Sequence, residues 1–267
     1  MEIGQWIWSV TDSSIYAASA RAIPALLPTV WIGSIRATRD GRVAGQLALS
    51  PRIAGVPRVG VVVRFEDDFG SVWASRSDSA IAADVGASLQ SMLGAATGAG
   101  VEIAEVQLDY DAPERLLARW SMVVATLSRD ALRGRTVWVT SLVAHVRERR
   151  YGDLFRGGVN GHILQVFDTG DRMSASYADQ LERLASRHRM PFRLGVAAFE
   201  RELADGSTTD HAAWFSATRV MARGPWYRGL WVFPGGRPWL PQLGSDSNFI
   251  DRTRAPASER IEPKEVR

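Results

Sequence analysis

The stretch Val-Gln-Leu-Asp-Tyr-Asp-Ala-Pro-Glu, residues 106–114, decides the fold of this chain. It predicts a short strand on which Gln107, Asp109 and Asp111 point to one face, while the residues between them point to the other. A carboxylate is costly to bury unless it is paired, hydrogen-bonded or protonated. Two carboxylates on one face therefore indicate a polar cavity at the end of the strand, which is where enzymes built on parallel strands place their chemistry.

Short apolar runs rich in β-forming residues recur along the chain and alternate with amphipathic segments. These runs predict eight strands, at residues 5–10, 29–35, 58–65, 104–109, 136–142, 162–167, 192–199 and 229–233. Apolar residues at helical spacing predict helices at residues 14–26, 79–97, 113–132 and 174–189. This alternation predicts the α/β class with a parallel sheet, and eight units predict that the sheet closes into a (β/α)8 TIM barrel.

Two connections depart from the regular pattern. Residues 41–52 indicate a short loop or hairpin, and residues 151–156 offer only a brief helix. A chain of 267 residues with 46% hydrophobic content is long enough for one large core. We therefore expect a single barrel domain over residues 1–250, with two smaller domains as the alternative. Residues 251–267 are charged, contain two prolines, and are expected to form a flexible, irregular C-terminal tail.

The composition excludes several classes of function. The net charge is +3, and the pI of about 9.7 arises because Lys264 is the only lysine among many arginines. Since no long basic run occurs, no nucleic-acid partner is expected. The absence of cysteine excludes disulfide and thiolate chemistry.

The start of the chain lacks a basic segment followed by an apolar one, and no apolar run reaches the length of a membrane helix, about 18 residues. Neither a signal peptide nor a membrane span is expected in the chain as given. The compartment stays open between the bacterial cytoplasm and, if a leader was removed, the periplasm. The sequence leaves the oligomeric state open too.

In a TIM barrel the carboxyl ends of the strands carry the active site, and here those ends collect acids, arginine, histidine and tryptophan. The candidate catalytic residues are Asp109, Asp111 and Asp168. The candidate substrate-binding residues are Trp8, Arg64, Gln107, Tyr110, His145, Gln165, Glu200 and Trp231. Indole rings cover the apolar face of a pyranose, and carboxylates bind hydroxyls and transfer protons. The set indicates a carbohydrate ligand, while phosphate-loop, zinc-site and serine-hydrolase motifs are absent, so no cofactor is expected.

The stretch Val-Gln-Leu-Asp-Tyr-Asp-Ala-Pro resembles the fourth-strand signature of chitinase-like (family 18) glycoside hydrolases, apolar-Asp-apolar-Asp-aromatic-Glu-aromatic-Pro. The resemblance implies that Asp109 is the middle carboxylate and Asp111 the catalytic acid, and that Gln107 occupies the position of the first aspartate. Residues 165–168, Gln-Val-Phe-Asp, resemble the group's Met-x-Tyr-Asp, and Trp231 resembles its pocket-floor tryptophan. Three departures stand out: Asp111 is one methylene shorter than the usual Glu, Gln107 cannot ionise, and the phenylalanine of the sixth strand lacks the tyrosine hydroxyl.

A second resemblance is to the bacterial family known as domain of unknown function 3142. It rests on a Trp-rich opening strand, a Gln-Leu-Asp-Tyr-Asp-Ala-like fourth strand and a Val-Thr-Ser-Leu fifth strand at residues 139–142. The match covers roughly residues 5–240. It implies a barrel with a link to carbohydrate.

Each candidate residue also has a simpler structural explanation. Asp111, just before a helix led by proline, is a candidate N-cap. Asp168 fits a turn, and Glu200 lies in a charge run typical of solvent-exposed loops. His145 lies among arginines and is most simply a loop histidine on a basic surface, with a contact to an anionic sugar as the alternative. Arg64 needs a carboxylate partner if it points inward.

The sequence therefore predicts a glycoside hydrolase in which Asp111 is the general acid. Asp109 would tune its pKa, because two neighbouring carboxylates resist double ionisation. In a substrate-assisted version, an acetamido group is the nucleophile, and Asp109 or Asp168 steadies the resulting cation. One alternative is a barrel without catalysis that binds carbohydrate or assists polysaccharide export, favoured by Gln107, Asp111 and Phe167. Another is an enzyme that holds a divalent cation at the three aspartates.

Overall fold

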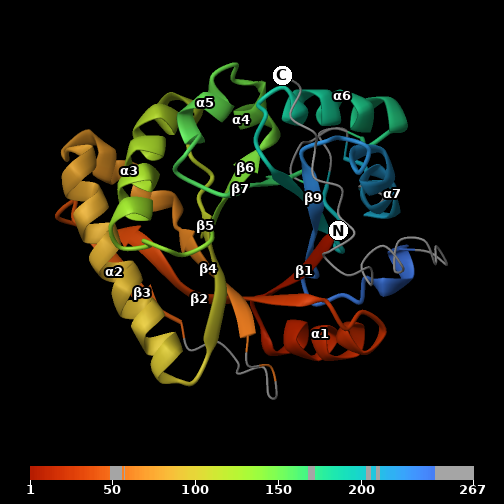
Figure 1. Ribbon diagram of the computed structural model, residues 1–267, viewed down its shortest axis with the longest axis horizontal. Helices are drawn as coiled ribbons and strands as arrows, with labels where there is room; N and C mark the ends of the chain where they lie inside the picture. The colour runs from red at the N-terminus through yellow and green to blue at the C-terminus, as the bar shows by residue number, and fades with distance from the viewer. Residues whose placement is uncertain (49–55, 57, 168–171, 203–205, 209–210, 244–267) are drawn as a thin grey trace.

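Eight parallel strands close into a ring in the computed structural model, which describes residues 1–48, 56, 58–167, 172–202, 206–208 and 211–243 (Figure 1). The strands are β1 (Glu2–Ile7), β2 (Leu27–Ala37), β4 (Arg58–Phe65), β5 (Glu102–Asp109), β6 (Val137–Leu142), β7 (Gly161–Gln165), β8 (Phe192–Ala197) and β9 (Tyr227–Phe233). They pair in the order β1-β9-β8-β7-β6-β5-β4-β2, and the pairing of β1 with β2 closes the ring. Because the helices lie outside it, the predicted TIM barrel is confirmed.

Every predicted strand overlaps a strand of the barrel, although the first is shifted. It was expected at residues 5–10, but β1 is Glu2–Ile7 because helix α1 (Val10–Ala22) begins directly afterwards. Ser9 caps that helix, since its hydroxyl accepts a hydrogen bond from the backbone N–H of Asp12 at 3.1 Å. A serine cap therefore fixes where the first strand ends.

The remaining helices follow most of the predicted pattern. They are α2 (Asp78–Gly98), α3 (Leu117–Arg129), α4 (Val143–Arg147), α5 (Tyr151–Phe155), α6 (Ala175–Ser186) and α7 (His211–Met221), with 3-10 helices η1 (Asp67–Ala74), η2 (Glu114–Leu116) and η3 (Leu240–Leu243). The long predicted helices correspond to α1, α2, α3 and α6, and the brief helix near residue 151 is α5. Ser77 and Ser174 cap α2 and α6 as Ser9 caps α1. Helices α4 and α7 were not predicted.

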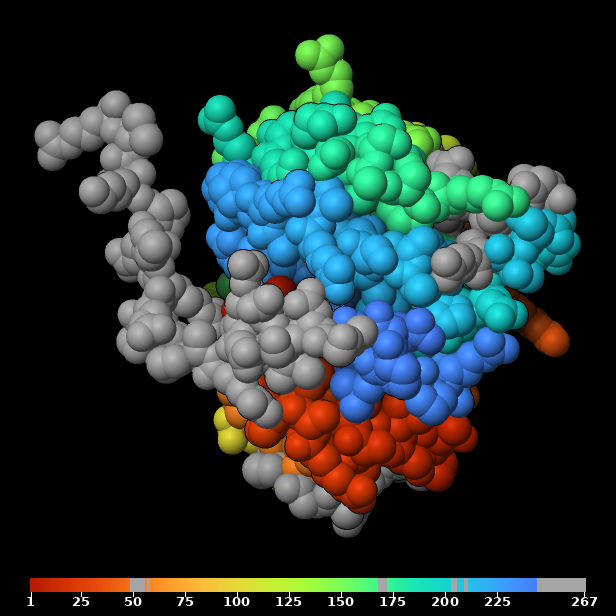
Figure 2. Space-filling view, turned by 90° about the vertical axis from the view of Figure 1, so that its right-hand side faces the viewer, coloured from red at the N-terminus to blue at the C-terminus, as the bar shows by residue number. Residues whose placement is uncertain are grey.

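On the side of the barrel shown in Figure 2, α6 and α7 lie side by side, and η3 lies between α7 and α1. Each buries one face, for example Ala178, Leu181 and Ala185 of α6. Within the described part of the chain, no helix is long and apolar enough to cross a membrane.

The connection after β2 is a hairpin. For residues 41–52 the sequence predicted either a short loop or a hairpin. Strand β3 (Val43–Leu47) runs antiparallel to the second half of β2, from Gly33 opposite Leu47 to Ala37 opposite Val43. Helix α2 packs over this hairpin. A Cβ on Gly45 would lie 2.7 Å from the Cβ of Ser88, so the close approach of β3 to α2 requires glycine there.

Near the amino ends of the strands, the barrel interior holds an ion cluster between two indole rings. Arg193 of β8 donates to both Glu105 oxygens at 2.6 and 2.8 Å, and to Glu2 at 2.6 and 2.9 Å. Its guanidinium carbon lies 3.6 Å from the ring centre of Trp138 and 3.7 Å from that of Trp231. Bidentate pairing and stacking on both faces satisfy this buried arginine.

Two glycines make room for those indole rings. A Cβ on Gly4 would lie 2.3 Å from the ring of Trp231, and one on Gly161 would lie 2.4 Å from the ring of Trp138. Each glycine sits on a strand of the barrel. The layer of side chains at the amino end of the barrel is therefore built from large rings opposite residues without side chains.

Candidate active site

Asp109 is the last residue of β5 and lies at the carboxyl end of the barrel, where it is 3% exposed. Its Oδ1 accepts a hydrogen bond from Gln165 Nε2 of β7 at 3.3 Å, and its Oδ2 lies 3.6 Å from Arg64 Nη1 of β4. Burial, together with the charge of Asp111, raises the pKa of Asp109 to about 7, against the opposing effects of Arg64, Thr140 and Gln165. Asp109 is therefore close to half-protonated at neutral pH.

Asp111 is exposed between two buried neighbours. It is the central residue of a tight turn in which the Ala112 N–H donates to the Tyr110 carbonyl at 2.8 Å. The alternative role as an N-cap does not match the structure, because η2 begins after Pro113 without a side-chain cap. Asp111 is thus an exposed residue of this turn, close enough to Asp109 for its charge to raise the pKa of that carboxyl.

An aromatic wall lies beside the two aspartates. Trp8 follows β1 and stacks on Trp31 of β2, with ring centres 5.3 Å apart and planes 22° apart. The Arg64 guanidinium carbon lies 5.9 Å from the Trp8 ring centre. Both tryptophans are partly exposed, so together with Arg64 they offer a surface for a sugar ring. Trp31 was not among the predicted binding residues, although the alternation of side chains along the predicted second strand indicates that it faces the barrel interior.

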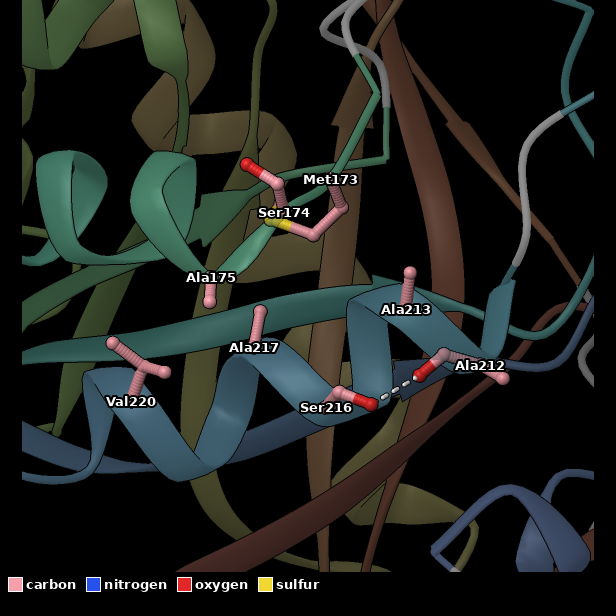
Figure 3. Close-up of a pocket in the computed structure, with 8 residues that line it drawn as sticks. All are labelled: Met173, Ser174, Ala175, Ala212, Ala213, Ser216, Ala217 and Val220. Carbon is pink, nitrogen blue, oxygen red and sulfur yellow. Dashed lines mark hydrogen bonds between the residues drawn. The ribbon is translucent and has the colours of Figure 1, made fainter.

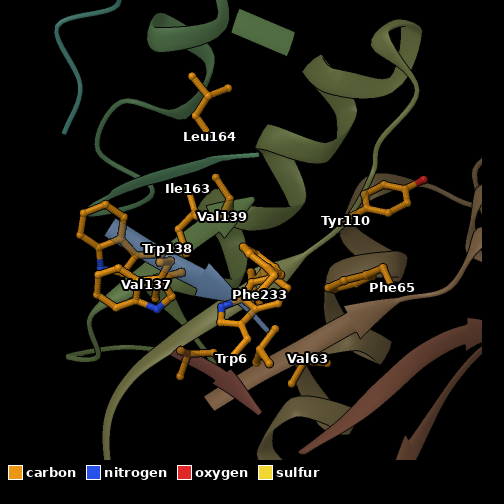
Figure 4. Packing of buried hydrophobic residues seen from close by; sticks show 14 of the residues in the cluster. Trp6, Val63, Phe65, Tyr110, Val137, Trp138, Val139, Ile163, Leu164 and Phe233 are labelled. Carbon is orange, nitrogen blue, oxygen red and sulfur yellow. The ribbon is translucent and has the colours of Figure 1, made fainter. Parts of the chain in front are cut away.

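More rings lie beneath this wall. Phe233 of β9 has its ring centre 3.8 Å from that of Trp6 and 4.8 Å from that of Phe167. Figure 4 shows Trp6 and Phe233 together inside the barrel, with Phe65 and Tyr110 away from them. The rings of Trp6, Phe167 and Phe233 therefore form an apolar layer under the rim of the barrel.

Gln107 lies deeper in the barrel than Asp109. Its Oε1 accepts from Trp6 Nε1 at 2.6 Å, and its Nε2 donates to Glu105 Oε1 at 2.7 Å. Because both ends of the amide are already bonded inside the barrel, Gln107 connects the ion cluster to the aromatic layer.

Trp231 and Tyr110 do not share the rim with Asp109. Trp231 is 1% exposed, donates to Thr29 Oγ1 at 3.0 Å and covers Arg193 near the amino end, so the expectation that it lies on the same rim was wrong. The tilt of the strands places it in the layer of side chains at the amino end of the barrel. Tyr110 points out of the barrel into the core, where its hydroxyl accepts from Trp73 Nε1 at 3.2 Å.

His145 is not the loop histidine of a basic surface that the neighbouring arginines indicated. It lies in α4 and is 2% exposed. Its Nδ1 accepts from the Leu142 N–H at 3.2 Å, and its Nε2 lies 2.7 Å from the Ala112 carbonyl oxygen. The histidine is therefore buried and bonded to the backbone directly after Asp111.

The remaining predicted residues are less informative. Glu200 is half-exposed and lies 3.7 Å from Arg237, as expected for a charge in a solvated run. Asp168 and the predicted tail, residues 251–267, lie outside the described residues. Within the described residues, no group of three or more acidic or histidine side chains could hold a metal ion. The metal alternative, which requires Asp168, stays untested.

Two hollows lie away from the rim. One, of about 540 Å³, opens at the amino end of the barrel beside Glu2, Arg193 and Trp231. The other, of about 290 Å³, lies between α6 and α7 and is lined by small side chains such as Ala175, Ala213 and Ala217 (Figure 3). Neither contains Asp109 or Asp111, so neither belongs to the candidate active site.

Solved structures of chitinases have this fold. The chain aligns with a family 18 chitinase from Crocus vernus with a TM-score of 0.61 and 11% identity, over 95% of this chain and 98% of the chitinase. The catalytic domain of a family GH18 chitinase from the fern Peteris ryukyuensis gives 0.60 and 12%, over 95% and 97%. A xylanase and α-amylase inhibitor protein, solved with trehalose, gives 0.58 and 12%, over 95% and 98%.

At these identities the likeness shows the fold, a TIM barrel like that of the family 18 chitinases. No protein-family model matches the chain, and no curated protein matches its sequence. The resemblance to the domain-of-unknown-function family thus rests on its short motifs alone.

Proposed function

We propose that the protein is a glycoside hydrolase that cleaves a polysaccharide or oligosaccharide at the carboxyl ends of the barrel strands. The observation that carries this proposal is the pair Asp109 and Asp111, one buried with a pKa raised to about 7 and one exposed beside it. A carboxyl group that keeps a proton near neutral pH, next to a solvent-facing carboxylate, is what general acid catalysis needs. Two of the aligned solved structures are chitinases, which supports the same chemistry.

In this mechanism the proton of the pair passes from Asp109 to Asp111, which gives it to the glycosidic oxygen as the bond to the anomeric carbon breaks. Asp109 shares the proton of the pair and stays close to Asp111, so that the pair carries one proton at a time. In the substrate-assisted version, an acetamido oxygen of the sugar attacks the anomeric carbon, and Asp109 or Asp168 steadies the positive charge on the resulting ring. Water then opens that ring and returns a proton to Asp111.

The same rim provides groups for substrate binding. Trp8 and Trp31 offer ring faces to the apolar side of a sugar, and Arg64 and Gln165 offer donors to its hydroxyls. Asp168 stays a proposed member of the site on the strength of the sixth-strand motif. Glu200 is a weaker candidate, because its half-exposed carboxylate already faces Arg237.

A hydrolysis screen tests the proposal. The protein is incubated with a panel of polysaccharides and oligosaccharides, with and without N-acetyl groups, and new reducing ends are measured. Release of reducing ends from at least one polymer supports the proposal, and a preference for N-acetylated polymers supports the substrate-assisted version. A complete lack of turnover on substrates that bind would contradict it.

A second candidate function is carbohydrate binding without catalysis, as in an accessory protein of polysaccharide export. Gln107 favours it, because an amide bonded at both ends replaces the first carboxylate of the chitinase signature. Phe167 favours it as well, since its ring packs against Phe233 and brings no hydroxyl. An inhibitor protein of the same fold has been solved with trehalose. Binding without turnover in the screen would support this function.

A further inference from the structure

The turn that carries Asp111 is held on three sides by neighbouring parts of the fold. The Tyr110 N–H donates to Thr140 Oγ1 of β6 at 3.1 Å, and the Tyr110 ring packs against Trp120 with centres 5.2 Å apart. The Ala112 N–H returns to the Tyr110 carbonyl, and the Ala112 methyl is buried. From Val106 to Ala112 every residue except Asp111 is buried, so the backbone that carries Asp111 is fixed by packing on both sides of it.

His145 also contacts this turn, and an imidazole suits the position because both ring nitrogens are used at once. Nδ1 accepts from the Leu142 N–H at 3.2 Å, which requires the proton to be on Nε2. Nε2 then donates to the Ala112 carbonyl oxygen at 2.7 Å. One neutral tautomer thus joins the start of α4 to the peptide that follows Asp111.

The surroundings keep that tautomer neutral. Burial lowers the pKa of His145, while the bond to Ala112 and the charges of Asp111 and Glu114 act in the opposite direction. Tyr151 lies behind the ring, with centres 6.3 Å apart and planes 21° apart. Because an imidazolium could not accept from the Leu142 N–H, the neutral form is the one that fits the two backbone partners.

We propose that His145 is a positioning residue of the active site: by holding the Ala112 peptide, it fixes how close the Asp111 carboxylate comes to Asp109. His145 is 2% exposed and is bonded to the backbone of Leu142 and Ala112, so it acts on Asp111 through the turn. The catalytic consequence rests on the proposed glycosidase function, whereas the effect on the two carboxylates does not.

Two variants separate the two hydrogen bonds of His145. In His145→Asn the shorter amide can still accept from Leu142 N–H but cannot reach Ala112, whereas in His145→Gln the longer amide can still donate to Ala112. The first measurement is the titration of Asp109 and Asp111 by carboxyl carbon-13 NMR in the wild type and both variants. We expect the upper midpoint of the pair to fall by roughly one pH unit in His145→Asn, because Asp111 moves away from Asp109, and to stay near the wild-type value in His145→Gln.

The second measurement is activity on the best substrate of the screen. His145→Asn should lower kcat roughly 10- to 100-fold with little change in KM and should shift the pH profile with the carboxyl titration, and His145→Gln should restore most of the rate. If the wild type hydrolyses nothing, the proposed function fails and the titration alone still tests the role of His145. An unchanged carboxyl titration in folded His145→Asn would overturn the proposal.

Nitrogen-15 NMR of the wild type provides a further test that needs no variant, and it applies if His145→Asn does not fold. We expect the resonances of His145 to show the Nε2-protonated neutral tautomer throughout the titration of the carboxyl pair. An Nδ1-protonated tautomer or an imidazolium at neutral pH would overturn the proposal.

Discussion

Gln165 and Asp109 meet across the mouth of the barrel, where Gln165 Nε2 lies 3.3 Å from Asp109 Oδ1. An amide N–H donates to a carboxylate and to the carbonyl oxygen of a carboxylic acid alike, so this contact survives a change in protonation. Arg64 contributes differently, because its charge favours only the ionised form of Asp109. The aspartate is thus held in place while its proton is free to leave.

The buried carboxyl of Asp109 should make the protein less stable as the pH rises. Its pKa is about 7 in the fold and near 4 in an unfolded chain, so the folded state binds the extra proton between these values. The contribution of Asp109 to the free energy of unfolding should therefore fall from about pH 4 to pH 7, by up to roughly 1.4 kcal/mol per pH unit. Asp109→Asn should remove this dependence and unfold at a higher temperature at pH 8 than the wild type. Thermal unfolding of both proteins from pH 4 to pH 8 measures the two effects, and a large loss of stability in Asp109→Asn would show instead that the carboxylate is structural.

His162 should have the opposite dependence on pH. Burial lowers the pKa of its ring to about 3, with His188 and His145 acting in the same direction, while an unfolded histidine titrates near 6.5. The unfolded state therefore binds the extra proton between these values, and stability should fall as the pH drops below about 6.5. Since Asp109 acts in the other direction, the wild type should show a shallow profile between pH 4 and 7. His162→Phe, which keeps a ring against Tyr151 but cannot be protonated, should become relatively more stable towards acid. Urea unfolding at pH 7 and pH 5 tests this. The same change in unfolding free energy between the two pH values in wild type and variant would contradict it.

The ion cluster at the amino end should be sensitive to the loss of its cation. Arg193→Met leaves Glu105 buried without its partner, which costs about 3–5 kcal/mol. Arg58→Met is the matched control, because Arg58 pairs with Glu102 at 3.2 Å with both side chains mostly exposed, and its loss should cost less than about 1 kcal/mol. Denaturant unfolding of both variants gives the comparison. Similar losses in the two would mean that the cluster contributes nothing beyond a surface pair.

The alternation of side chains on β5 and β9 could be predicted from the sequence. The position of each side chain along the barrel axis could not. Trp231 points inward, as its position in the strand implies, yet it lies at the amino end with Arg193 because the strands are tilted and staggered. Residues that face the interior on different strands therefore share a layer only when the stagger brings them together. The sequence contains no direct sign of that stagger.

Two other differences have distinct causes. His145 was misread because its partners are the backbone groups of Leu142 and Ala112, and backbone partners leave no mark on side-chain identity. Helix α7 was overlooked although its pattern is present, since Trp214, Ala217, Thr218 and Met221 are buried at three- and four-residue spacing. The first could not have been predicted from one sequence, and the second could.

The exposed carboxylate of Asp111 separates an enzyme from a binding protein. Asp111→Asn keeps the size and the hydrogen-bonding reach of the side chain but cannot deliver a proton, so turnover should fall by roughly 10²-fold or more while binding survives. Asp111→Glu should retain part of the activity, because it restores the acid found in chitinase-like enzymes. Glu114→Gln is the control, since it removes another exposed carboxylate three residues further along, at the start of η2, and should leave turnover unchanged. The measurement is kcat and KM for all four proteins on the best substrate, with direct binding alongside. Equal turnover in wild type and Asp111→Asn would remove Asp111 from the mechanism, and tight binding without turnover in all four would identify a carbohydrate-binding barrel.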